Sequence, residues 1–198
     1  HGLVDELTAR GVDVRVQWGD RTGTIVVLVD ADGERTMITD RGAAAHLTAI
    51  DSGVLDDVGW LHVPLYGLAV PEPAAAIIEL CHTASQRSIP VSVDASSVAL
   101  IDELGLEVAR RLLADLSPTV LFANADEAAA LGLSASGVPE RLPAIVIVKR
   151  GADPSSVHLR DGTVVDVPSL PLDRPVDTTA AGDTFAAGFL THDGWRHD

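Results

Sequence analysis

The sequence has one cysteine, few aromatic residues, few basic residues and no long apolar run. Cys81 cannot form an internal disulfide, which predicts a cytoplasmic location where thiols stay reduced. The 14 lysines and arginines stand against 29 aspartates and glutamates, giving a net charge of -15. This charge argues against nucleic acid or an anionic membrane as a partner. No apolar stretch approaches the roughly 20 residues of a membrane helix, and the first residues lack a signal-peptide pattern.

The remaining composition is that of a globular protein. The chain of 198 residues is 46% hydrophobic, which is enough for one domain with its own core. From residue 60 onward, short apolar strands alternate with helical patterns. Pro71 favours the start of one helix, and the spacing of apolar residues from Leu104 to Leu116 predicts another, single helix. Residues 144–148 are fully apolar, as in a covered parallel strand. This alternation predicts a mostly parallel sheet with ligands at the carboxyl ends of its strands.

Residues 12–38 have a different pattern, which predicts a separate antiparallel unit. Alternating apolar residues from Val12 to Trp18 predict a half-exposed strand. Residues 24–29 predict a second strand, and a strong turn signal at Asp32-Gly33 predicts a hairpin. A second hairpin is predicted around residues 161–162. Exposed strand edges in the first unit predict pairing between two subunits, and therefore a homodimer.

The most informative stretch is residues 176–185, VDTTAAGDTF, which precede an apolar, Ala-rich run that predicts a helix. The small residues 180–182 let backbone N–H groups come close to a ligand, and a helix N-terminus favours an anion such as phosphate. Asp183 would repel a phosphate, but it suits a base that takes a proton from an attacking hydroxyl. The stretch therefore predicts phosphoryl transfer to an alcohol. The structural alternative for Asp183 is a helix N-cap.

Residues 177–185 resemble the signature of ribokinase-like carbohydrate kinases, the PfkB family. Asn124-Ala125-Asp126-Glu127 resembles the family's Asn-x-x-Glu motif. Val148-Lys149-Arg150-Gly151 resembles the strand end that contacts the nucleotide, and residues 91–94 resemble the strand that ends in an Asp near the phosphates. Residues 12–40 look like the β lid that covers the sugar. The resemblance implies a ribokinase-like three-layer α/β/α fold with a mostly parallel sheet, forming a single domain over 1–198 with 12–40 as the lid.

The chain also departs from the family pattern. The family's N-terminal strands with their Gly-Gly motif, and the part that follows the signature helix, have no counterpart here. We therefore expect both termini to be truncated or segments to be missing. Pro154 stands where the family usually has Gly, and proline has no N–H to donate to a phosphate.

The resemblance implies a role for several single residues. It makes Asp183 the general base on the substrate hydroxyl. It places the anion hole at Ala180, Ala181 and Gly182, nucleotide contacts at Asn124, Lys149 and Gly151, Mg²⁺ near Glu127 (through water) and Asp94, and a monovalent cation such as K⁺ on backbone oxygens of Asp177 and Thr179. Arg35 on the lid could reach the substrate.

Each of these residues has a structural alternative. Residues 180–182 could serve tight packing, and Asn124 with Glu127 could form a helix capping box. Lys149 could be a solvated charge and Asp94 a loop cap. Asp177 and Thr179 could serve turn chemistry, and Arg35 could simply lie on an exposed strand.

The implied function is transfer of the γ-phosphoryl group of Mg-ATP to a primary hydroxyl of a sugar or sugar acid. A nucleoside kinase or a 2-keto-3-deoxygluconate kinase stays open, because the residues that choose the substrate belong largely to the absent N-terminal part. A non-catalytic nucleotide-binding relative or fragment is the other alternative. A Rossmann dehydrogenase is disfavoured because no Gly-x-Gly-x-x-Gly follows a strand.

Overall fold

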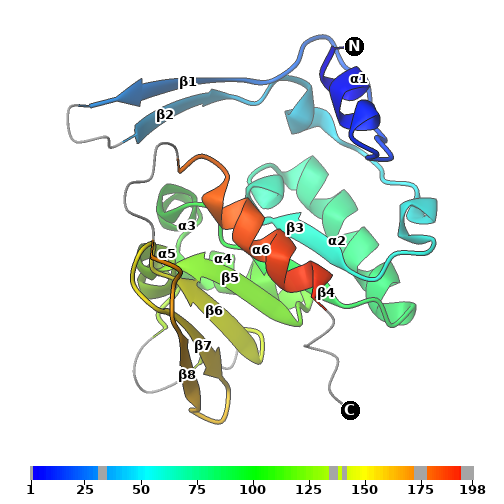
Figure 1. The fold of residues 1–198 in the computed structure, drawn as a ribbon. Coiled ribbons are helices and arrows are strands. Elements are labelled where there is room, and N and C mark those ends of the chain that lie inside the picture. Colours follow the sequence, from blue (N-terminus) through cyan, green and yellow to red (C-terminus); the bar gives the residue numbers. More distant parts are fainter. Residues whose placement is uncertain (1, 31–34, 134–137, 140–141, 172–177, 193–198) are drawn as a thin grey trace. The chain divides into compact units, whose positions relative to one another are not determined.

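The structure is a computed structural model that describes residues 2–30, 35–133, 138–139, 142–171 and 178–192 (Figure 1). The chain forms two compact units, His1–Ala49 and Ile50–Asp198. The assignment of residues 1–198 to a single domain with a lid stays a prediction. No helix in the described ranges is long and apolar enough to cross a membrane.

The first unit contains an antiparallel hairpin, as the sequence predicts. Its elements are helix α1 (Gly2–Ala9), strands β1 (Thr24–Val29) and β2 (Arg35–Asp40) and the 3-10 helix η1 (Gly42–His46). The register pairs Thr24 with Asp40 and Val29 with Arg35. β1 and β2 form a two-stranded sheet.

The strand predicted from Val12 to Trp18 was wrong, because this segment is irregular. The segment is joined to residue 48 by hydrogen bonds of the Gln17 side chain, and not by a backbone ladder with a neighbouring strand. The Gln17 amide oxygen accepts the Thr48 N–H at 3.1 Å, and its nitrogen donates to the Thr48 hydroxyl at 3.2 Å. Alternation of apolar residues indicates two chemically different faces, but it does not supply the partner strand that a sheet needs.

The second unit contains a six-stranded sheet with the order β3-β4-β5-β6-β7-β8. Its strands are β3 (Leu61–Pro64), β4 (Val91–Asp94), β5 (Val120–Asn124), β6 (Ile145–Lys149), β7 (Ser155–Leu159) and β8 (Val164–Val167). The strands from β3 to β6 are parallel, and β7 and β8 add an antiparallel hairpin. The mostly parallel sheet and the second hairpin are therefore confirmed.

Helices cover both faces of this sheet and complete the three-layer α/β/α fold. They are α2 (Pro71–Gln86), α3 (Val98–Leu104), α4 (Leu106–Leu116), α5 (Ala125–Ala130) and α6 (Ala181–Thr191), with the 3-10 turns η2 (Ser52–Leu55) and η3 (Leu65–Leu68). In Figure 1, α6 lies in front of the strands and α2 to α5 lie behind them.

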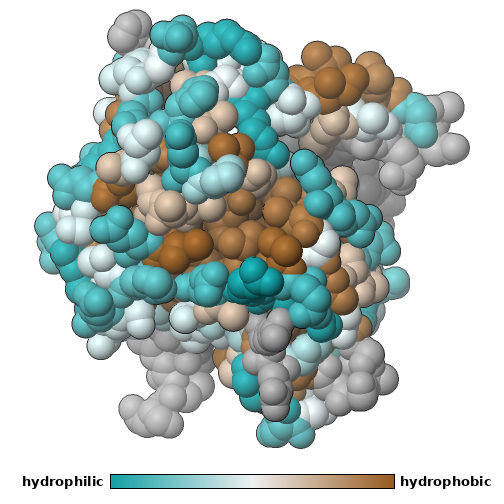
Figure 2. All heavy atoms as spheres, turned by 180° about the vertical axis from the view of Figure 1, so that it is seen from behind, coloured by the Kyte–Doolittle hydropathy of each residue, from teal (hydrophilic) through white to brown (hydrophobic). Residues whose placement is uncertain are grey.

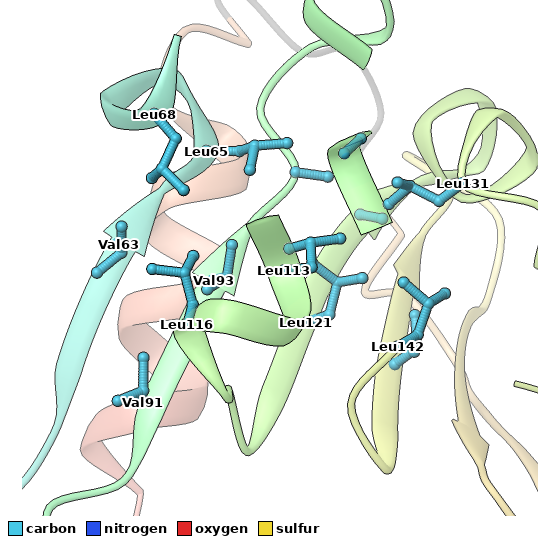
Figure 3. Packing of buried hydrophobic residues seen from close by; sticks show 14 of the residues in the cluster. Val63, Leu65, Leu68, Val91, Val93, Leu113, Leu116, Leu121, Leu131 and Leu142 are labelled. Atoms are coloured by element: carbon cyan, nitrogen blue, oxygen red, sulfur yellow. The ribbon is translucent and has the colours of Figure 1, made fainter. Parts of the chain in front are cut away.

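The alternation of side chains along each strand divides the core into two clusters. On the face of α2 to α5, Leu113 and Leu116 of α4 pack towards Val93 and Leu121 of the sheet (Figure 3). On the opposite face, the neighbouring residue Phe122 is buried with Ala186 of α6. Strand β5 therefore packs against the helical layers on both faces of the sheet.

The single helix predicted from Leu104 to Leu116 was wrong, because the structure has two helices, α3 and α4. They are separated at Gly105, whose φ of +79° lies in the left-handed region that favours glycine. The apolar spacing continues across the break, since both helices face the same core. Periodicity alone therefore could not reveal the interruption.

Candidate functional site

A pocket of about 840 Å³ in the second unit lies at the carboxyl ends of the parallel strands and at the start of α6. It is lined by most of the residues that the sequence singled out: Asp94, Asn124, Glu127, Lys149, Gly151, Ala180, Ala181, Gly182 and Asp183. The strand register explains part of this grouping. Asn124 pairs with Lys149 at the ends of β5 and β6, and Asp94 ends β4 on the next strand.

Three predicted residues are not among the lining residues. Thr179 is described but does not line the pocket. Asp177 lies outside the described residues, and so does the side chain of Arg35, which belongs to β2 in the first unit.

Lys149 and Asp94 form a close ion pair inside the pocket. The ammonium Nζ lies 2.6 Å from Asp94 Oδ2, and the two side chains are only 15% and 13% exposed. The other carboxylate oxygen of Asp94 accepts the Ser96 N–H at 2.9 Å. Asp94 therefore caps its loop and also binds Lys149, and the alternative of a solvated Lys149 was wrong. The pair joins residues 55 positions apart, so sequence spacing carried no signal of it.

Asn124 and Glu127 form a capping box at the start of α5. The structural alternative is therefore present, although both residues also line the pocket. Glu127 is buried, with 5% of its surface exposed. Burial raises the pKa of its carboxyl group. The Asn124 N–H and the Lys149 charge act in the opposite direction, while the charge of Asp94 adds to the rise.

The start of α6 has an unusual backbone. The N-cap is Ala180, with φ +58° in the left-handed region and no side-chain cap. This conformation costs a non-glycine residue roughly 1 kcal/mol. Asp183 lies in the first turn of the helix, so its interpretation as the N-cap was wrong. The Ala181 N–H donates to the Thr178 carbonyl at 3.2 Å.

His62 on β3 is an exposed residue near this site. Its Nδ1 lies 2.9 Å from the Ser92 hydroxyl, and its ring meets Phe122 edge to face with centroids 6.1 Å apart. Partial burial lowers the His62 pKa, the Asp94 and Asp183 charges raise it, and the Lys149 charge lowers it.

Tyr66 and Ser96 line the pocket, and sequence reasoning did not find them. Both follow shortly after the end of a parallel strand, β3 or β4. Their positions directly after strands were the available signal, because loops at these ends build ligand sites.

The acidic side chains fit a magnesium ion only together with a ligand. Among the described residues, no three His, Cys, Asp or Glu side chains gather into a metal-binding group. Mg²⁺ usually binds through one or two carboxylates, substrate phosphates and waters. Asp94 and Glu127 line the same pocket, and two carboxylates match the number that such a site uses.

The mostly parallel sheet, the helical layers on both sides and the pocket at the start of α6 define a ribokinase-like fold. The chain belongs to the family described as pfkB family carbohydrate kinase, whose model matches residues 1–192.

Two curated relatives resemble the chain in sequence. An ATP-dependent ribose-1-phosphate kinase of Halopiger xanaduensis is 34% identical over 195 residues, which cover 93% of this chain and 60% of that relative. A 2-dehydro-3-deoxygluconokinase of Escherichia coli K12 is 53% identical over 47 residues, or 23% of this chain and 15% of that protein. The chain thus spans 60% of the length of the first relative.

Two solved structures share the fold. Adenosine kinase from Sinorhizobium meliloti superposes with a TM-score of 0.82 at 26% identity, over 94% of this chain and 60% of that one. A putative ribokinase II from E. coli in complex with ATP and Mg²⁺ has a TM-score of 0.76 at 24% identity, over 98% and 67% of the two chains.

Proposed function

We propose that the protein is an ATP-dependent kinase that transfers the γ-phosphoryl group to a primary hydroxyl of a sugar or sugar acid. One observation carries this proposal. Asp183 in the first turn of α6 lines the same pocket as the Lys149–Asp94 pair and Glu127. Phosphoryl transfer to an alcohol needs groups of these kinds: a base (Asp183), a cation (Lys149) and a buried carboxylate at a helix start (Glu127). Membership of the pfkB family supports the same reaction.

Asp183 is the proposed general base. It lies in the first turn of α6 and is exposed to the pocket, so an acceptor hydroxyl can reach its carboxylate. Ala180, Ala181 and Gly182 form the proposed anion hole. Because the Ala181 N–H already donates to Thr178, the Gly182 N–H is the better candidate donor to a phosphoryl oxygen.

Asn124, Lys149 and Gly151 would contact the nucleotide. Glu127, through water, would hold Mg²⁺ against its phosphates, with Asp94 near the ion. When bound, Mg²⁺ neutralises charge on the phosphates and orients them. The buried carboxylate of Glu127 suits this role, because a cation offsets the cost of its charge in a buried position. Thr179 and Asp177 are the proposed backbone ligands of K⁺, with Asp177 outside the described residues.

The substrate proposal follows from the relatives. The match over 195 residues is to a ribose-1-phosphate kinase, which favours a sugar. The 53% identity over 47 residues to a 2-dehydro-3-deoxygluconokinase favours a sugar acid locally, and the adenosine kinase structure keeps a nucleoside open. Arg35 on β2 is the proposed lid contact to the substrate. We further propose a cytoplasmic homodimer that pairs through the hairpin of β1 and β2.

The test is a phosphorylation assay on the full-length protein with Mg-ATP and a panel of acceptors. The panel contains ribose, ribose 1-phosphate, 2-keto-3-deoxygluconate and adenosine. We expect transfer to a sugar or sugar acid. Asp183→Asn should keep nucleotide binding and lower turnover about a hundredfold to ten-thousandfold. Undiminished turnover in this variant would reject the base, and Mg-ATP binding without transfer to any acceptor would favour a non-catalytic protein.

A further inference from the structure

The Lys149 ammonium lies between a negatively charged carboxylate and the start of a helix. On one side is the Asp94 carboxylate, 2.6 Å away. On the other is the start of α6, where a Cβ added at Gly182 would lie 3.0 Å from Nζ. The absence of a side chain at Gly182 therefore leaves the space in which the ammonium sits beside the helix backbone.

This position is electrostatically unusual. A helix N-terminus carries partial positive charge, so a cation beside it is disfavoured unless a negative group is present. Asp94 supplies that group, and its second oxygen is fixed by the Ser96 N–H. The carboxylate of Glu127 on α5 also lies within electrostatic range of Lys149. An ammonium held at a helix start in this way is prepared to bind an anion.

We propose that Lys149 binds the terminal phosphoryl group of ATP, and that Asp94 is the positioning residue that holds its ammonium beside Gly182. The proposal rests on the proposed function. It assigns Lys149 to one phosphate of the nucleotide and gives Asp94 a task besides its place near Mg²⁺. In the structure the carboxylate neutralises the ammonium, and the arriving phosphate oxygen takes over part of that contact.

The terminal phosphate is favoured by the neighbours of Gly182 in the chain. Asp183, the proposed base, directly follows Gly182, and a base must lie near the acceptor hydroxyl. The transferred phosphoryl group lies between the acceptor and the rest of the nucleotide. A cation beside Gly182 is therefore on the side of the transferred group, whereas Gly151 lies further along the loop that follows β6.

The test compares binding of Mg-ATP and Mg-ADP to the full-length protein by calorimetry. Lys149→Met should weaken ATP binding about tenfold to a hundredfold, the range for a hydrogen bond to a charged group, and should change ADP binding little. Asp94→Asn should weaken ATP more than ADP as well. The ATP-to-ADP affinity ratio of the double variant should equal that of Lys149→Met, because both changes remove one arrangement. Arg111→Met, which removes a cation from the exposed side of α4, is the matched control and should leave the ATP-to-ADP ratio unchanged.

A chemical rescue keeps the test independent of folding defects in one variant. Lys149→Cys followed by bromoethylamine rebuilds an ammonium on a side chain of the same length. The other cysteine, Cys81, is buried, and burial raises its pKa to about 11, so it reacts slowly. We expect the alkylated variant to regain its preference for ATP.

Two results would overturn the proposal. Equal losses of ATP and ADP affinity in Lys149→Met would assign Lys149 to another part of the nucleotide, while nucleotide binding itself would stand. An alkylated Lys149→Cys variant that binds ADP normally but does not regain ATP preference would also contradict it. Failure of the unmodified protein to bind either nucleotide would instead contradict the proposed function, and this proposal with it.

Discussion

Asn124 and Glu127 each bind the backbone of the other at the start of α5. The Asn124 side-chain oxygen accepts the Glu127 N–H at 2.8 Å, and Glu127 Oε2 accepts the Asn124 N–H at 2.8 Å. The capping role uses one carboxylate oxygen of Glu127 and leaves the other for a different partner. A structural role and a role in the pocket are therefore compatible in the same two residues.

Substitutions at Glu127 should separate these two roles. Glu127→Gln keeps an oxygen that can accept the Asn124 N–H, so we expect nearly unchanged stability but a higher Mg²⁺ requirement for turnover. Glu127→Ala removes the cap and should cost about 1–2 kcal/mol of unfolding free energy. Urea unfolding and Mg²⁺ titration of activity measure the two effects. An unchanged Mg²⁺ requirement in Glu127→Gln would argue for a purely structural residue.

The raised pKa of Glu127 has a consequence for stability against pH. Burial makes the folded state hold this proton more tightly than the unfolded state does. Stability from this group is therefore greatest at low pH and falls as pH rises from about 4.5 through the folded-state pKa. In Glu127→Gln this decrease in stability with rising pH should be absent. Urea unfolding between about pH 4 and pH 7, which is roughly the window of a raised carboxyl pKa, measures the difference. The same slope in both proteins would contradict the assignment.

Phe122 connects the sheet to the helix that carries Asp183. It is fully buried, and its ring meets Phe185 and Phe189 of α6 edge to face, with centroids 6.3 and 5.5 Å apart. Phe122→Leu should cost about 1–3 kcal/mol of stability and should also lower turnover, since α6 loses its support. The measurements are thermal unfolding and kcat.

The control for this prediction is the neighbouring residue on the same strand. Leu121 faces the opposite core cluster, with α2 to α5. Leu121→Ala should destabilise the protein by about 2–5 kcal/mol but leave kcat of the folded enzyme nearly unchanged. Equal effects of the two variants on kcat would show that α6 does not depend on Phe122.

The sequence predicted the fold class and nine of the residues that line the pocket, because both follow from chain order. Parallel strands end at one edge of a sheet, so the polar residues after β4, β5 and β6 had to meet there. The signature then supplied the helix start with Asp183. None of this reasoning needed a distance between residues far apart in the chain.

Other features could not be predicted because they depend on three-dimensional contacts. The Lys149–Asp94 pair required the register of β4, β5 and β6. The break at Gly105 was hidden because α3 and α4 share one apolar face. Ala180 has a left-handed backbone conformation, which alanine does not favour. Its residue type would therefore have predicted a different backbone conformation.

His62 gives a stability prediction with the opposite sign to that of Glu127. Burial lowers the pKa of His62 below the ordinary value of about 6.5, and the Lys149 charge acts in the same direction. The Asp94 and Asp183 charges raise the pKa but do not offset this decrease. The contribution of neutral His62 is fully present above about pH 6.5 and is lost as pH falls through the folded-state pKa.

Substitution of His62 should remove part of this pH dependence. Asn in its place can still reach the Ser92 hydroxyl. The free energy of unfolding should therefore depend less steeply on pH in His62→Asn than in the parent. The range to measure is about pH 5 to 7.5, which brackets the histidine pKa. The effect should be small because His62 is exposed on one side. His82→Asn on the exposed side of α2 is the control, and an equal change in both variants would reject the assignment.

The hairpin of β1 and β2 tests the proposed homodimer. Both of its faces carry exposed apolar side chains: Val26 and Ile38 on one face, Val27 and Met37 on the other. In Figure 2 the hairpin presents an apolar surface at the upper right. Apolar faces and unpaired strand edges of this kind favour association with another chain.

We expect a dimer in analytical ultracentrifugation, and we expect one face of the hairpin to carry the contact. Val26→Glu with Ile38→Glu places two charges on the first face, and Val27→Glu with Met37→Glu places them on the second. One of these double variants should sediment as a monomer, because burying paired like charges in an interface is costly, while the other stays dimeric. Stability should change little, since these side chains are exposed within the chain. A parent protein that sediments as a monomer, or a dimer that survives both double variants, would contradict pairing through the hairpin.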